Sequence, residues 1–485
     1  MKNSSLVYKK SISSIKWNYL GVFARIFMQL VIQTYMARKI GPEEYGAFAA
    51  VVLLTGIVCI LIEAGVGALI IKSNKISLAR IKNLIALNFL LAIVFSVLLA
   101  LIFNNKILNL IGVDKEVSPY LISSVLVFYS FSCVPTAMLK KMFLYKQMQV
   151  AQNLSYAICF GVVGFLIIEF EKSFLAPLCS LVLFNITYSL ALLLALNNQS
   201  FEYTEENSEN LFLLFGSVFS NVQNWIIENI DNYLIGRLMG GVALGYYAVS
   251  YNFVRSPANS FVATFQSVAF SAFSAVNEKK NSKIVDAYCV SIALIVCASS
   301  FLFGFLFLIS DYVILFFYGN QWIYAASVLK PLALAMIFHS VMAVAGPLLV
   351  ASGGIKKDIL SQSISAFLMA LAIYAYCSGG GEVAGAAWVV CGVYFFRCLT
   401  INIFIAHHFE LSKKYIFVNV VPAFLFLISF SVGLFFIEAN KNSPVLGIFY
   451  MISLWCVLFL MLCFFPKNSI FAVLFSEKFI NKRFK

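Results

Sequence analysis

The sequence predicts an all-α membrane protein with many spans, and three observations support this fold class. Of its 485 residues, 62% are hydrophobic and only 11% are charged, and the mean hydropathy is +0.92. Soluble globular proteins carry about 25% charged residues. Apolar runs of roughly 20 residues, enough to cross the hydrocarbon core of a bilayer, recur along the whole chain. The segments between these runs are short. These observations exclude soluble domains, disulfide scaffolds, disordered chains and nucleic-acid-binding proteins.

About fourteen membrane-spanning helices are expected from these runs. They are expected at residues 17–37, 47–71, 84–103, 119–139, 151–168, 174–196, 212–238, 245–272, 284–309, 325–351, 359–377, 383–405, 417–437 and 444–465. The first run carries Arg25, Gln29 and Gln33 and lacks a small-residue cleavage site, so we interpret it as a retained span. The segment from Asp311 to Trp322 is expected to break at Tyr318-Gly319-Asn320.

The orientation follows from lysine and arginine, which are enriched in cytoplasmic loops. One alternate set of connecting segments, including both chain ends, holds 23 of the 34 Lys and Arg residues, and the other set holds 7. We therefore expect both termini in the cytoplasm, and the net charge of +13 reflects this bias rather than a nucleic-acid partner. The 11 cysteines lie mostly within apolar runs and form no Cys-x-x-Cys pair. They predict neither disulfides nor a metal site, and no cofactor is expected.

An internal repeat relates two stretches of the chain at an offset of 199 residues. Residues 37–49 and 236–248 share the identical pairs Arg38/Arg237, Gly41/Gly240, Gly46/Gly245 and Ala49/Ala248. In the preceding helices the same offset aligns polar residues, at Arg25/Asn224, Gln29/Glu228 and Gln33/Asn232. Gly41-Pro42 and Gly240-Gly241 favour helix breaks, and the spacing Gly241-x-x-x-Gly245 also suits close helix packing. Of these two interpretations of the glycines, the break is favoured.

The repeat predicts two six-helix bundles related by a pseudo-two-fold axis along the membrane normal, because each half has an even number of spans. The expected domains are an N-terminal bundle at 1–196, an acidic cytoplasmic linker at 197–210, a C-terminal bundle at 211–410, two appended helices at 411–466 and a basic amphipathic cytoplasmic tail at 467–485. Such a tail suits a surface of anionic lipid. No loop exceeds about 15 residues, which leaves little room for a water-exposed active site, so the protein is not expected to be an enzyme.

Polar stripes run along three of the predicted helices, where they cannot face lipid. In the first helix the stripe consists of Arg25, Gln29 and Gln33, which recur every four residues. In the seventh helix one face carries Asn221, Asn224, Glu228 and Asp231, and the eighth helix carries Tyr251, Asn252 and Arg255 among other polar residues. The repeat places the first and seventh helices opposite each other, which predicts a polar cavity lined by helices 1, 2, 7 and 8.

Six charged residues lie away from the predicted span ends. They are Arg25, Glu63, Glu228, Asp231, Arg255 and Arg397. Each central charge costs about 2.5–3.5 kcal/mol on insertion, so pairing or solvation must remove most of that cost. Two interpretations stay open: ion pairs that lock the bundle, or a functional site. The position of His339 within an apolar span favours a packed core residue over a proton carrier. The position of His407 and His408 at a predicted helix end favours a solvated or capping role.

Three stretches of the sequence resemble a known family. They are Gly41-Pro42-Glu43-Glu44-Tyr45-Gly46-Ala47-Phe48, Glu63-Ala64-Gly65-Val66-Gly67-Ala68-Leu69-Ile70, and Asp231-Asn232-Tyr233-Leu234-Ile235-Gly236 with Leu244-Gly245-Tyr246-Tyr247-Ala248. They are similar to the Wzx-type polysaccharide and O-antigen flippases of the multidrug/oligosaccharidyl-lipid/polysaccharide exporter superfamily. The resemblance covers nearly the whole chain, including its length and helix count. It implies a two-bundle, MATE-like fold in the bacterial cytoplasmic (inner) membrane.

The resemblance also implies what the polar residues do. The substrate would be a polyprenyl-pyrophosphate-linked oligosaccharide, moved from the cytoplasmic to the outer face by alternating access. Arg25, Arg255 and Arg397 would attract the pyrophosphate, and Gln29, Gln33, Asn224, Tyr251 and Asn252 would hydrogen-bond sugar hydroxyls. Glu228 and Asp231, with Glu63, would couple transport to an H⁺ or Na⁺ gradient. Membrane lipids and other polysaccharide-assembly proteins would be the remaining partners.

Two other functions are compared with this one. A cation-coupled multidrug exporter of the same superfamily would take mostly cationic substrates, and an acidic cavity with few arginines is expected for it. Arg25 and Arg255 disfavour that function. A membrane polysaccharide polymerase or ligase would need a sizeable water-exposed site, which the short loops disfavour.

Overall fold

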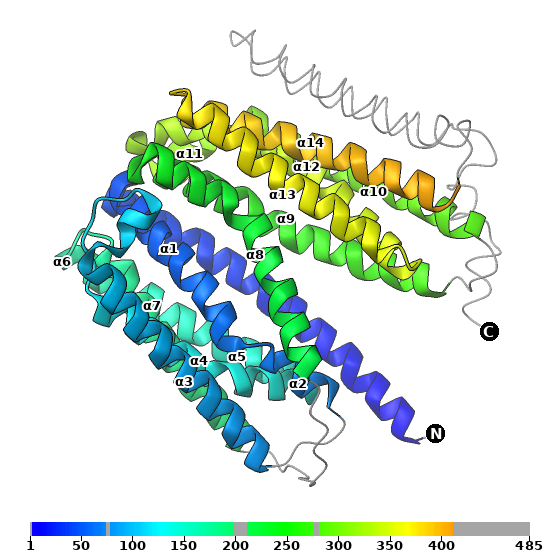
Figure 1. The fold of residues 1–485 in the computed structure, drawn as a ribbon, viewed down its shortest axis with the longest axis horizontal. Coiled ribbons are helices and arrows are strands. Elements are labelled where there is room, and N and C mark those ends of the chain that lie inside the picture. Colours follow the sequence, from blue (N-terminus) through cyan, green and yellow to red (C-terminus); the bar gives the residue numbers. More distant parts are fainter. Residues whose placement is uncertain (1, 74–77, 198–210, 276–280, 411–485) are drawn as a thin grey trace. The chain divides into compact units, whose positions relative to one another are not determined.

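A computed structural model describes residues 2–73, 78–197, 211–275 and 281–410 of the chain. The predicted linker at 198–210, the two appended helices and the basic tail lie outside these residues. Every regular element in the described part is a helix (Figure 1). The elements are α1 (Lys2–Glu63), α2 (Val66–Lys72), α3 (Leu78–Phe103), η1 (Asn104–Ile111), α4 (Pro119–Lys141), α5 (Tyr145–Tyr156), η2 (Ala157–Val163), α6 (Gly164–Phe170), α7 (Leu175–Asn197), α8 (Leu211–Met239), α9 (Gly241–Ala275), α10 (Asn281–Leu308), α11 (Ser310–Tyr318), η3 (Asn320–Trp322), α12 (Ile323–Ala351), α13 (Ile355–Ser378) and α14 (Val383–His408). The all-α prediction is therefore confirmed for this part of the chain.

Most predicted spans match one helix or one set of consecutive helices. Eight helices in the described residues are long and apolar enough to cross a membrane, and a ninth candidate is the bent pair Ala298–Leu308 and Ser310–Tyr318. The helix α1 counts once here, although it contains the first predicted span and most of the second. The second predicted span differs from the structure at its end, because the left-handed backbone of Ala64 (φ 47°) and Gly65 (φ 69°) separates α1 from α2.

The contacts divide the chain into two compact units. The first comprises Met1–Ala248 with Tyr318–Trp322, and the second comprises Val249–Phe317 with Ile323–Lys485. The division falls inside α9, whose first eight residues pack with the first unit. This division describes packing, and the predicted domain boundaries at the repeat stay a prediction.

In the first unit, α1 is two helices that meet at a break, and Figure 1 shows its two halves as separate rods. Gly41 has φ 77° and ψ 176°, and Pro42 begins the second half. Both residues act as the sequence predicts, since glycine tolerates a positive φ and proline suits the first turn of a helix. The repeat-related Gly240 also has a positive φ, of 86°, and separates α8 from α9.

The two breaks pack directly on each other through repeat-related residues. A side-chain carbon on Gly46 would collide with the carbonyl of Gly241, and one on Gly245 would collide with the carbonyl of Pro42. Because Pro42 and Gly241 differ by the repeat offset, as do Gly46 and Gly245, the two contacts are reciprocal. The glycines therefore serve both roles that the sequence suggested, the helix break and the close approach of two backbones.

The short segment Tyr318–Trp322 also packs on the α1 break, although the two are far apart in the sequence. Pro42 has no N–H with which to bond the carbonyl of Arg38 in the preceding turn. The side-chain Nε2 of Gln321 donates to that carbonyl at 2.6 Å, and the indole Nε1 of Trp322 donates to the carbonyl of Ala37 at 3.0 Å. The Trp322 side chain is fully buried, and Tyr45 meets it edge to face. The predicted break at 318–320 is confirmed, with φ 88° at Gly319.

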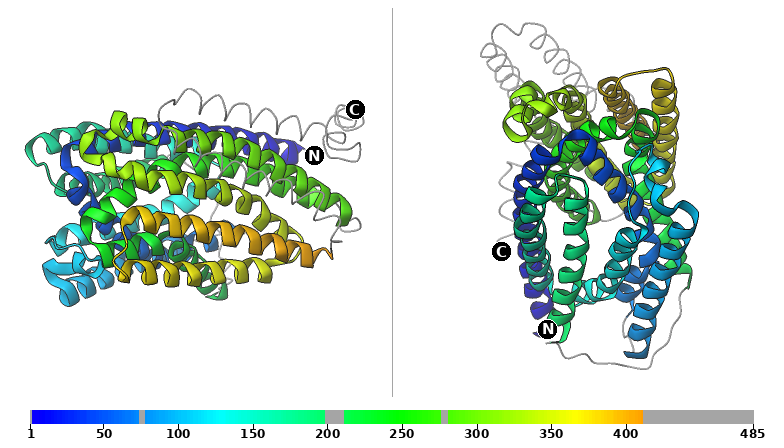
Figure 2. Two further views of the ribbon diagram at one scale, coloured as in Figure 1. Left: turned by 90° about the horizontal axis from the view of Figure 1, so that it is seen from above. Right: turned by 90° about the vertical axis from the view of Figure 1, so that its left-hand side faces the viewer.

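The second unit has its core in α12. Most of this helix is buried, and it packs against α10 and α14, while α13 packs on α14 (Figures 1 and 2). One face of α13 carries Asp358, Ser361 and Ser365, which are buried, whereas Phe367 and Leu371 are 72% and 54% exposed. This polar-in, apolar-out arrangement is the reverse of a soluble helix and suits contact with lipid.

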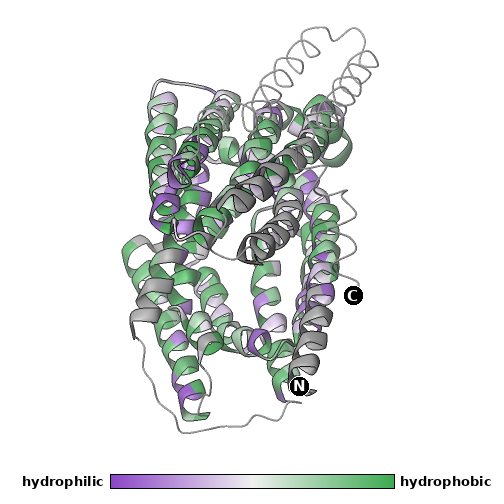
Figure 3. Cartoon of the chain, turned by 90° about the vertical axis from the view of Figure 1, so that its right-hand side faces the viewer, coloured by the Kyte–Doolittle hydropathy of each residue, from purple (hydrophilic) through white to green (hydrophobic). Residues whose placement is uncertain are grey.

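The outer face of α3 shows the same preference for lipid. Leu90, Val94, Leu98 and Leu101 lie on one side of the helix, and Leu101 is 78% exposed. Colouring by hydropathy shows helices that are mostly hydrophobic, interrupted by isolated hydrophilic stretches (Figure 3). Exposed apolar surface of this extent is not stable in water, and it supports the prediction of a multi-pass membrane protein.

Candidate functional site

The predicted polar stripe of α1 faces other helices of its own unit. The side chain of Asn18 accepts a hydrogen bond of 2.8 Å from Gln149, and the carbonyl of Gly21 accepts one of 2.9 Å from Asn153. Both donors lie on α5. Farther along the stripe, the half-buried guanidinium of Arg25 lies near the hydroxyl of Tyr188 on α7.

The glutamines of the stripe are half-buried as well. The side chain of Gln33 lies beside the hydroxyl of Tyr156 at the end of α5, and Gln29 lies between Arg25 and Gln33 on the same face. Arg25 has no ion pair among the described residues, so a locking ion pair is not what holds its charge there. The stripe places an arginine and two amides inside the first unit.

The predicted polar face of α8 divides into an exposed and a buried part. Asn224 and Glu228 are exposed, whereas Asp231 is only 2% exposed. The carboxylate of Asp231 accepts hydrogen bonds from the hydroxyl of Tyr247 at 2.7 Å and from the backbone N–H of Asn232 at 2.7 Å. These bonds tie α8 to the start of α9. Asp231 is therefore held in a buried polar network, which the sequence pattern did not show.

Glu63 lies at the last residue of α1, just before the left-handed turn that leads to α2. Its carboxylate is close to Lys140 on α4 and to the buried Cys133 on the same helix. The neighbouring Lys141 donates to the carbonyl of Ser73 at 2.7 Å. Glu63 thus lies at a junction of α1, α2 and α4, away from the stripe of α1.

In the second unit, two of the predicted arginines lie near one histidine. The positive charges of Arg255 on α9 and Arg397 on α14 both act on the imidazole of His339 on α12. The guanidinium of Arg255 lies over the ring of Tyr251 at 5.3 Å, whereas the predicted Asn252 is exposed. The ring of Tyr394 meets His339 at 5.8 Å between centroids.

Arg397 has an acidic neighbour that sequence reasoning did not single out. Asp358 on α13 lies near it, is 8% exposed, and accepts a hydrogen bond of 2.9 Å from Gln362. A signal existed, because Asp358, Ser361, Gln362 and Ser365 share one face of the helix. His339 was considered a packed core residue, and its nearness to two arginines is a tertiary feature that no local pattern encodes.

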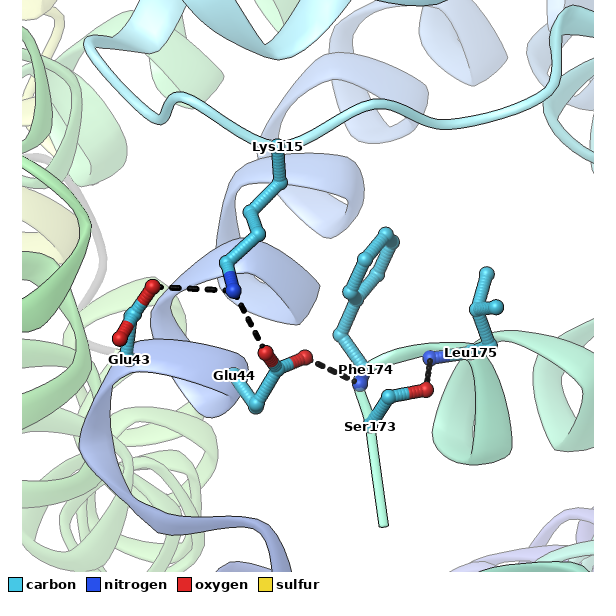
Figure 4. Close-up of polar contacts among 6 residues, drawn as sticks. All are labelled: Glu43, Glu44, Lys115, Ser173, Phe174 and Leu175. Atoms are coloured by element: carbon cyan, nitrogen blue, oxygen red, sulfur yellow. Dashed lines mark hydrogen bonds and ion pairs between the residues drawn. The ribbon is translucent and has the colours of Figure 1, made fainter. Parts of the chain in front are cut away.

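A charged cluster lies where the second half of α1 meets the loop before α4 and the start of α7 (Figure 4). The Nζ of Lys115 forms ion pairs with Glu44 at 2.7 Å and Glu43 at 2.9 Å. Glu44 also accepts from the backbone N–H of Phe174 at 2.8 Å. Hydrogen bonding to Glu44, and then to Glu43, raises the pKa of Lys115. These contacts join the second half of α1 to the loop before α4 and to the residue before α7, so we interpret the cluster as structural.

The described residues offer no group of three or more His, Cys, Asp and Glu side chains that could hold a metal ion. The side chains described at the candidate sites offer charge and hydrogen bonding. The first unit contributes Arg25 and the amides of α1, and the second contributes Arg255, His339 and Arg397.

Comparisons with known proteins identify a family. The family described as "Polysaccharide biosynthesis protein" matches residues 35–327. The teichuronic acid biosynthesis protein TuaB of Bacillus subtilis is 28% identical over 269 residues, which are 53% of this chain and about half, 55%, of that protein. The lipopolysaccharide biosynthesis protein WzxC of Escherichia coli is 22% identical over 399 residues, covering 79% of this chain and 78% of that protein.

Solved structures with the same fold include two kinds of transporter. The lipid II flippase MurJ in an inward closed conformation aligns with a TM-score of 0.66 and 14% identity, over 93% of this chain and 98% of MurJ. An inward-facing multidrug resistance transporter of the MATE family aligns with a TM-score of 0.61 and 14% identity, over 80% of this chain and 96% of that chain. At this identity the likeness shows the fold, and the predicted MATE-like fold class is confirmed.

Proposed function

Because the chain belongs to the polysaccharide biosynthesis protein family, we propose that it is a flippase for a lipid-linked oligosaccharide. The substrate is a polyprenyl-pyrophosphate-linked repeat unit of an O-antigen, capsule or exopolysaccharide, moved from the cytoplasmic to the outer face of the inner membrane. The printed names of its relatives, in teichuronic acid and lipopolysaccharide biosynthesis, and the lipid II flippase fold support this substrate class. The family and the fold are those of transporters, so the protein is not an enzyme.

The observation that carries this proposal is the position of Arg25 and Arg397 inside membrane-spanning helices. Among the described residues, neither Arg25 nor Arg397 forms an ion pair with a carboxylate. A charge at that depth is costly unless water or a counter-charge compensates it. Arginine stays charged and its planar fork matches phosphate oxygens, so a pyrophosphate is a suitable counter-charge.

The remaining polar residues have roles that suit a glycan. Gln29, Gln33, Asn224, Tyr251 and Asn252 would hydrogen-bond sugar hydroxyls, while the polyprenyl tail stays in lipid. Alternating access would expose these groups first to the cytoplasm and then to the outside. Both termini would lie in the cytoplasm, as the distribution of lysine and arginine indicates. Membrane lipids and other polysaccharide-assembly proteins would be its partners.

Coupling to an H⁺ or Na⁺ gradient is the finer part of the proposal. Glu228 is an exposed carboxylate on α8, where a cation could reach it. Asp231 lies one turn away and accepts hydrogen bonds from Tyr247 and Asn232, so a change in its charge would alter the contact between α8 and α9. Glu63 lies at the α1–α2–α4 junction and is the third candidate.

The test is export of the glycan in cells that lack the native protein. Cells that carry Arg25→Ala or Arg397→Ala should accumulate the lipid-linked oligosaccharide on the cytoplasmic face, and Lys at either position should restore export in part. The matched control is Arg38→Ala, since Arg38 lies on the same helix as Arg25 but is exposed near its break. Normal surface glycan in both test variants would refute the role of the arginines.

A cation-coupled multidrug exporter is the alternative, and the MATE-family likeness favours it. The arginines argue against it, because they would repel a cationic drug. Drug resistance conferred by the wild-type protein, without any effect on surface glycan, would favour this alternative.

A further inference from the structure

In the first unit, each helix break on the predicted outer side is covered by a loop from the other half of the predicted repeat. Residues 318–322, between α11 and α12, cover the α1 break, and are called the first strap here. Residues 109–113, between α3 and α4, cover the break between α8 and α9, and are called the second strap. Spans 3 and 4 correspond to spans 9 and 10 in the predicted repeat, so the two straps are equivalent loops that cross between the halves.

The first strap contacts the last carbonyls of α1 before its break. The side chain of Gln321 donates to the carbonyl of Arg38 at 2.6 Å, and the indole of Trp322 donates to the carbonyl of Ala37 at 3.0 Å. The first bond is exposed and the second is buried. Water can replace side-chain donors of this kind when a contact opens, so the first strap is able to release and to bind again.

The second strap contacts the equivalent carbonyls of α8. The repeat offset of 199 residues converts the two acceptor positions of α1 into Gly236 and Arg237. A side-chain carbon on Gly112, which has a φ of 73°, would collide with the carbonyl oxygens of both residues. The Nη1 of Arg237 also donates to the carbonyl of Asn109 at 2.9 Å. The straps therefore cover the same two positions in the two halves.

Trp322 of the first strap packs on both halves at once. Its ring meets that of Tyr45, in the second half of α1, edge to face at 5.7 Å between centroids. It meets that of Tyr246, near the start of α9, edge to face at 5.9 Å. The hydroxyl of Tyr246 also donates to the carbonyl of Gln321 at 3.4 Å, and Trp322 is fully buried. Trp322 therefore joins α1 to α9.

The backbones of α1 and α9 leave no passage beside this tryptophan. Gly46 packs on the carbonyl of Gly241, and Gly245 packs on the carbonyl of Pro42, without room for a side-chain carbon at either glycine. An oligosaccharide can pass between these two helices only if they separate. The ring of Trp322 can then remain with one helix and must leave the other.

We propose that the first strap holds the predicted outer side closed, and that Trp322 must leave Tyr45 or Tyr246 before the substrate is released outward. This inference rests on the proposed function for the substrate and for alternating access. The strap is a conformational device: it favours the outer-closed state and thereby sets the population of the outer-open one. The second strap opposes the same separation through Arg237 and Gly112.

Distances between spin labels in the full chain test the proposal. The 11 cysteines are first replaced by serine or alanine, and the protein is placed in lipid nanodiscs. One labelled pair, Lys172→Cys with Val242→Cys, reports the predicted outer side, and a second pair, Lys82→Cys with Phe219→Cys, reports the predicted cytoplasmic side. All four positions are exposed. Double electron–electron resonance gives the distance distribution of each pair.

Weakening the strap should favour the outer-open state. In Trp322→Phe the carbonyl of Ala37 has a donor only when water reaches it. The population with a longer outer distance should therefore rise about fivefold, as the loss of one hydrogen bond predicts, while the cytoplasmic distance shortens. Gln321→Leu should give a smaller change in the same direction, and its exposed bond makes it the variant that tests the strap if Trp322→Phe does not fold. The matched control is Trp17→Phe, at the predicted cytoplasmic end of α1.

Each outcome either supports or refutes the strap. Unchanged distances in both strap variants refute it, even if the melting temperature falls, because the segment then only stabilises the fold. Equal broadening of both labelled pairs also refutes it, since that indicates loose packing rather than opening of one side. The same shift in Trp17→Phe would refute the assignment to Trp322. None of these results affects the flippase proposal, which fails separately if the protein without substitutions does not restore glycan export.

Discussion

The indole of Trp322 donates a hydrogen bond of 3.0 Å to the carbonyl of Ala37, across 285 residues of sequence. The acceptor lies one turn before Gly41, where α1 breaks, and the indole is fully buried. The neighbouring Gln321 donates to the carbonyl of Arg38, the one that Pro42 cannot serve. The segment after α11 therefore stabilises the break of α1 by donating hydrogen bonds to the carbonyls of Ala37 and Arg38.

We predict that Trp322→Phe destabilises the protein more than Gln321→Leu does. The Phe side chain removes the donor and leaves a buried carbonyl unsatisfied, at a cost of about 1–3 kcal/mol. The bond of Gln321 is exposed, and water can replace it. Thermal unfolding in detergent measures both effects, and equal losses in the two variants would contradict this account.

Alanine at either repeat-related glycine should disrupt the first unit. In Gly46→Ala the new methyl group would meet the carbonyl of Gly241, and in Gly245→Ala that of Pro42. Overpacking of this kind costs about 1–3 kcal/mol. Because a backbone cannot yield as a side chain does, we expect a lower melting temperature and reduced export in both variants.

The matched control for the glycines is Gly392→Ala in α14. Nothing lies within 4 Å of a side-chain carbon at this position, and the backbone is helical. The substitution should be neutral or stabilise the helix by up to about 1 kcal/mol. A loss as large as that of Gly46→Ala would show that the close backbone approach is not the cause.

Glu44→Gln should destabilise the loop cluster of Figure 4 more than Glu43→Gln does. Glu44 is 20% exposed and bonds both Lys115 and the backbone of Phe174, whereas Glu43 is 61% exposed and bonds only Lys115 in the drawn cluster. We expect a cost of about 1–2 kcal/mol for Glu44 and under about 0.5 kcal/mol for Glu43. Thermal unfolding at pH 7 compares them.

The raised pKa of Lys115 predicts how the loss of stability in Lys115→Met depends on pH. A raised pKa means that the contribution of the lysine is fully present below the unfolded pKa of about 10.4 and is lost only as the pH rises through the higher folded value. The difference in melting temperature between wild type and Lys115→Met should therefore be constant from pH 7 to pH 9. A difference that fades over this range would contradict the ion pairs.

Substitutions on α8 should separate coupling from stability. Glu228→Gln changes an exposed carboxylate, so we expect weaker dependence of transport on the ion gradient and a smaller change in melting temperature than for Asp231→Asn. Asp231→Asn perturbs a buried hydrogen-bond network and should lower the melting temperature as well. A double-mutant cycle of Asp231→Asn and Tyr247→Phe measures the hydrogen bond between the two side chains. If the two losses of stability are strictly additive, this bond contributes nothing to stability.

The sequence alone determined the helices and where most of them break. Hydrophobic length is a local property, so runs of about 20 apolar residues marked the spans, and Gly41, Gly240 and Gly319 marked breaks because glycine permits a positive φ. The offset of 199 residues also predicted which residues are equivalent. The sequence also identified Arg25, Arg255 and Arg397 as charges inside spans, because the residues around them in the sequence are mostly apolar.

Only the tertiary structure decided which residues meet. The reciprocal packing of Gly46 on Gly241 and of Gly245 on Pro42, the return of Trp322 to Ala37, and the burial of Asp231 against Tyr247 depend on helices distant in sequence. His339 has apolar neighbours along its own helix, and its two arginines come from other helices. Periodicity reports which face of a helix a residue occupies, but only packing determines what that face touches.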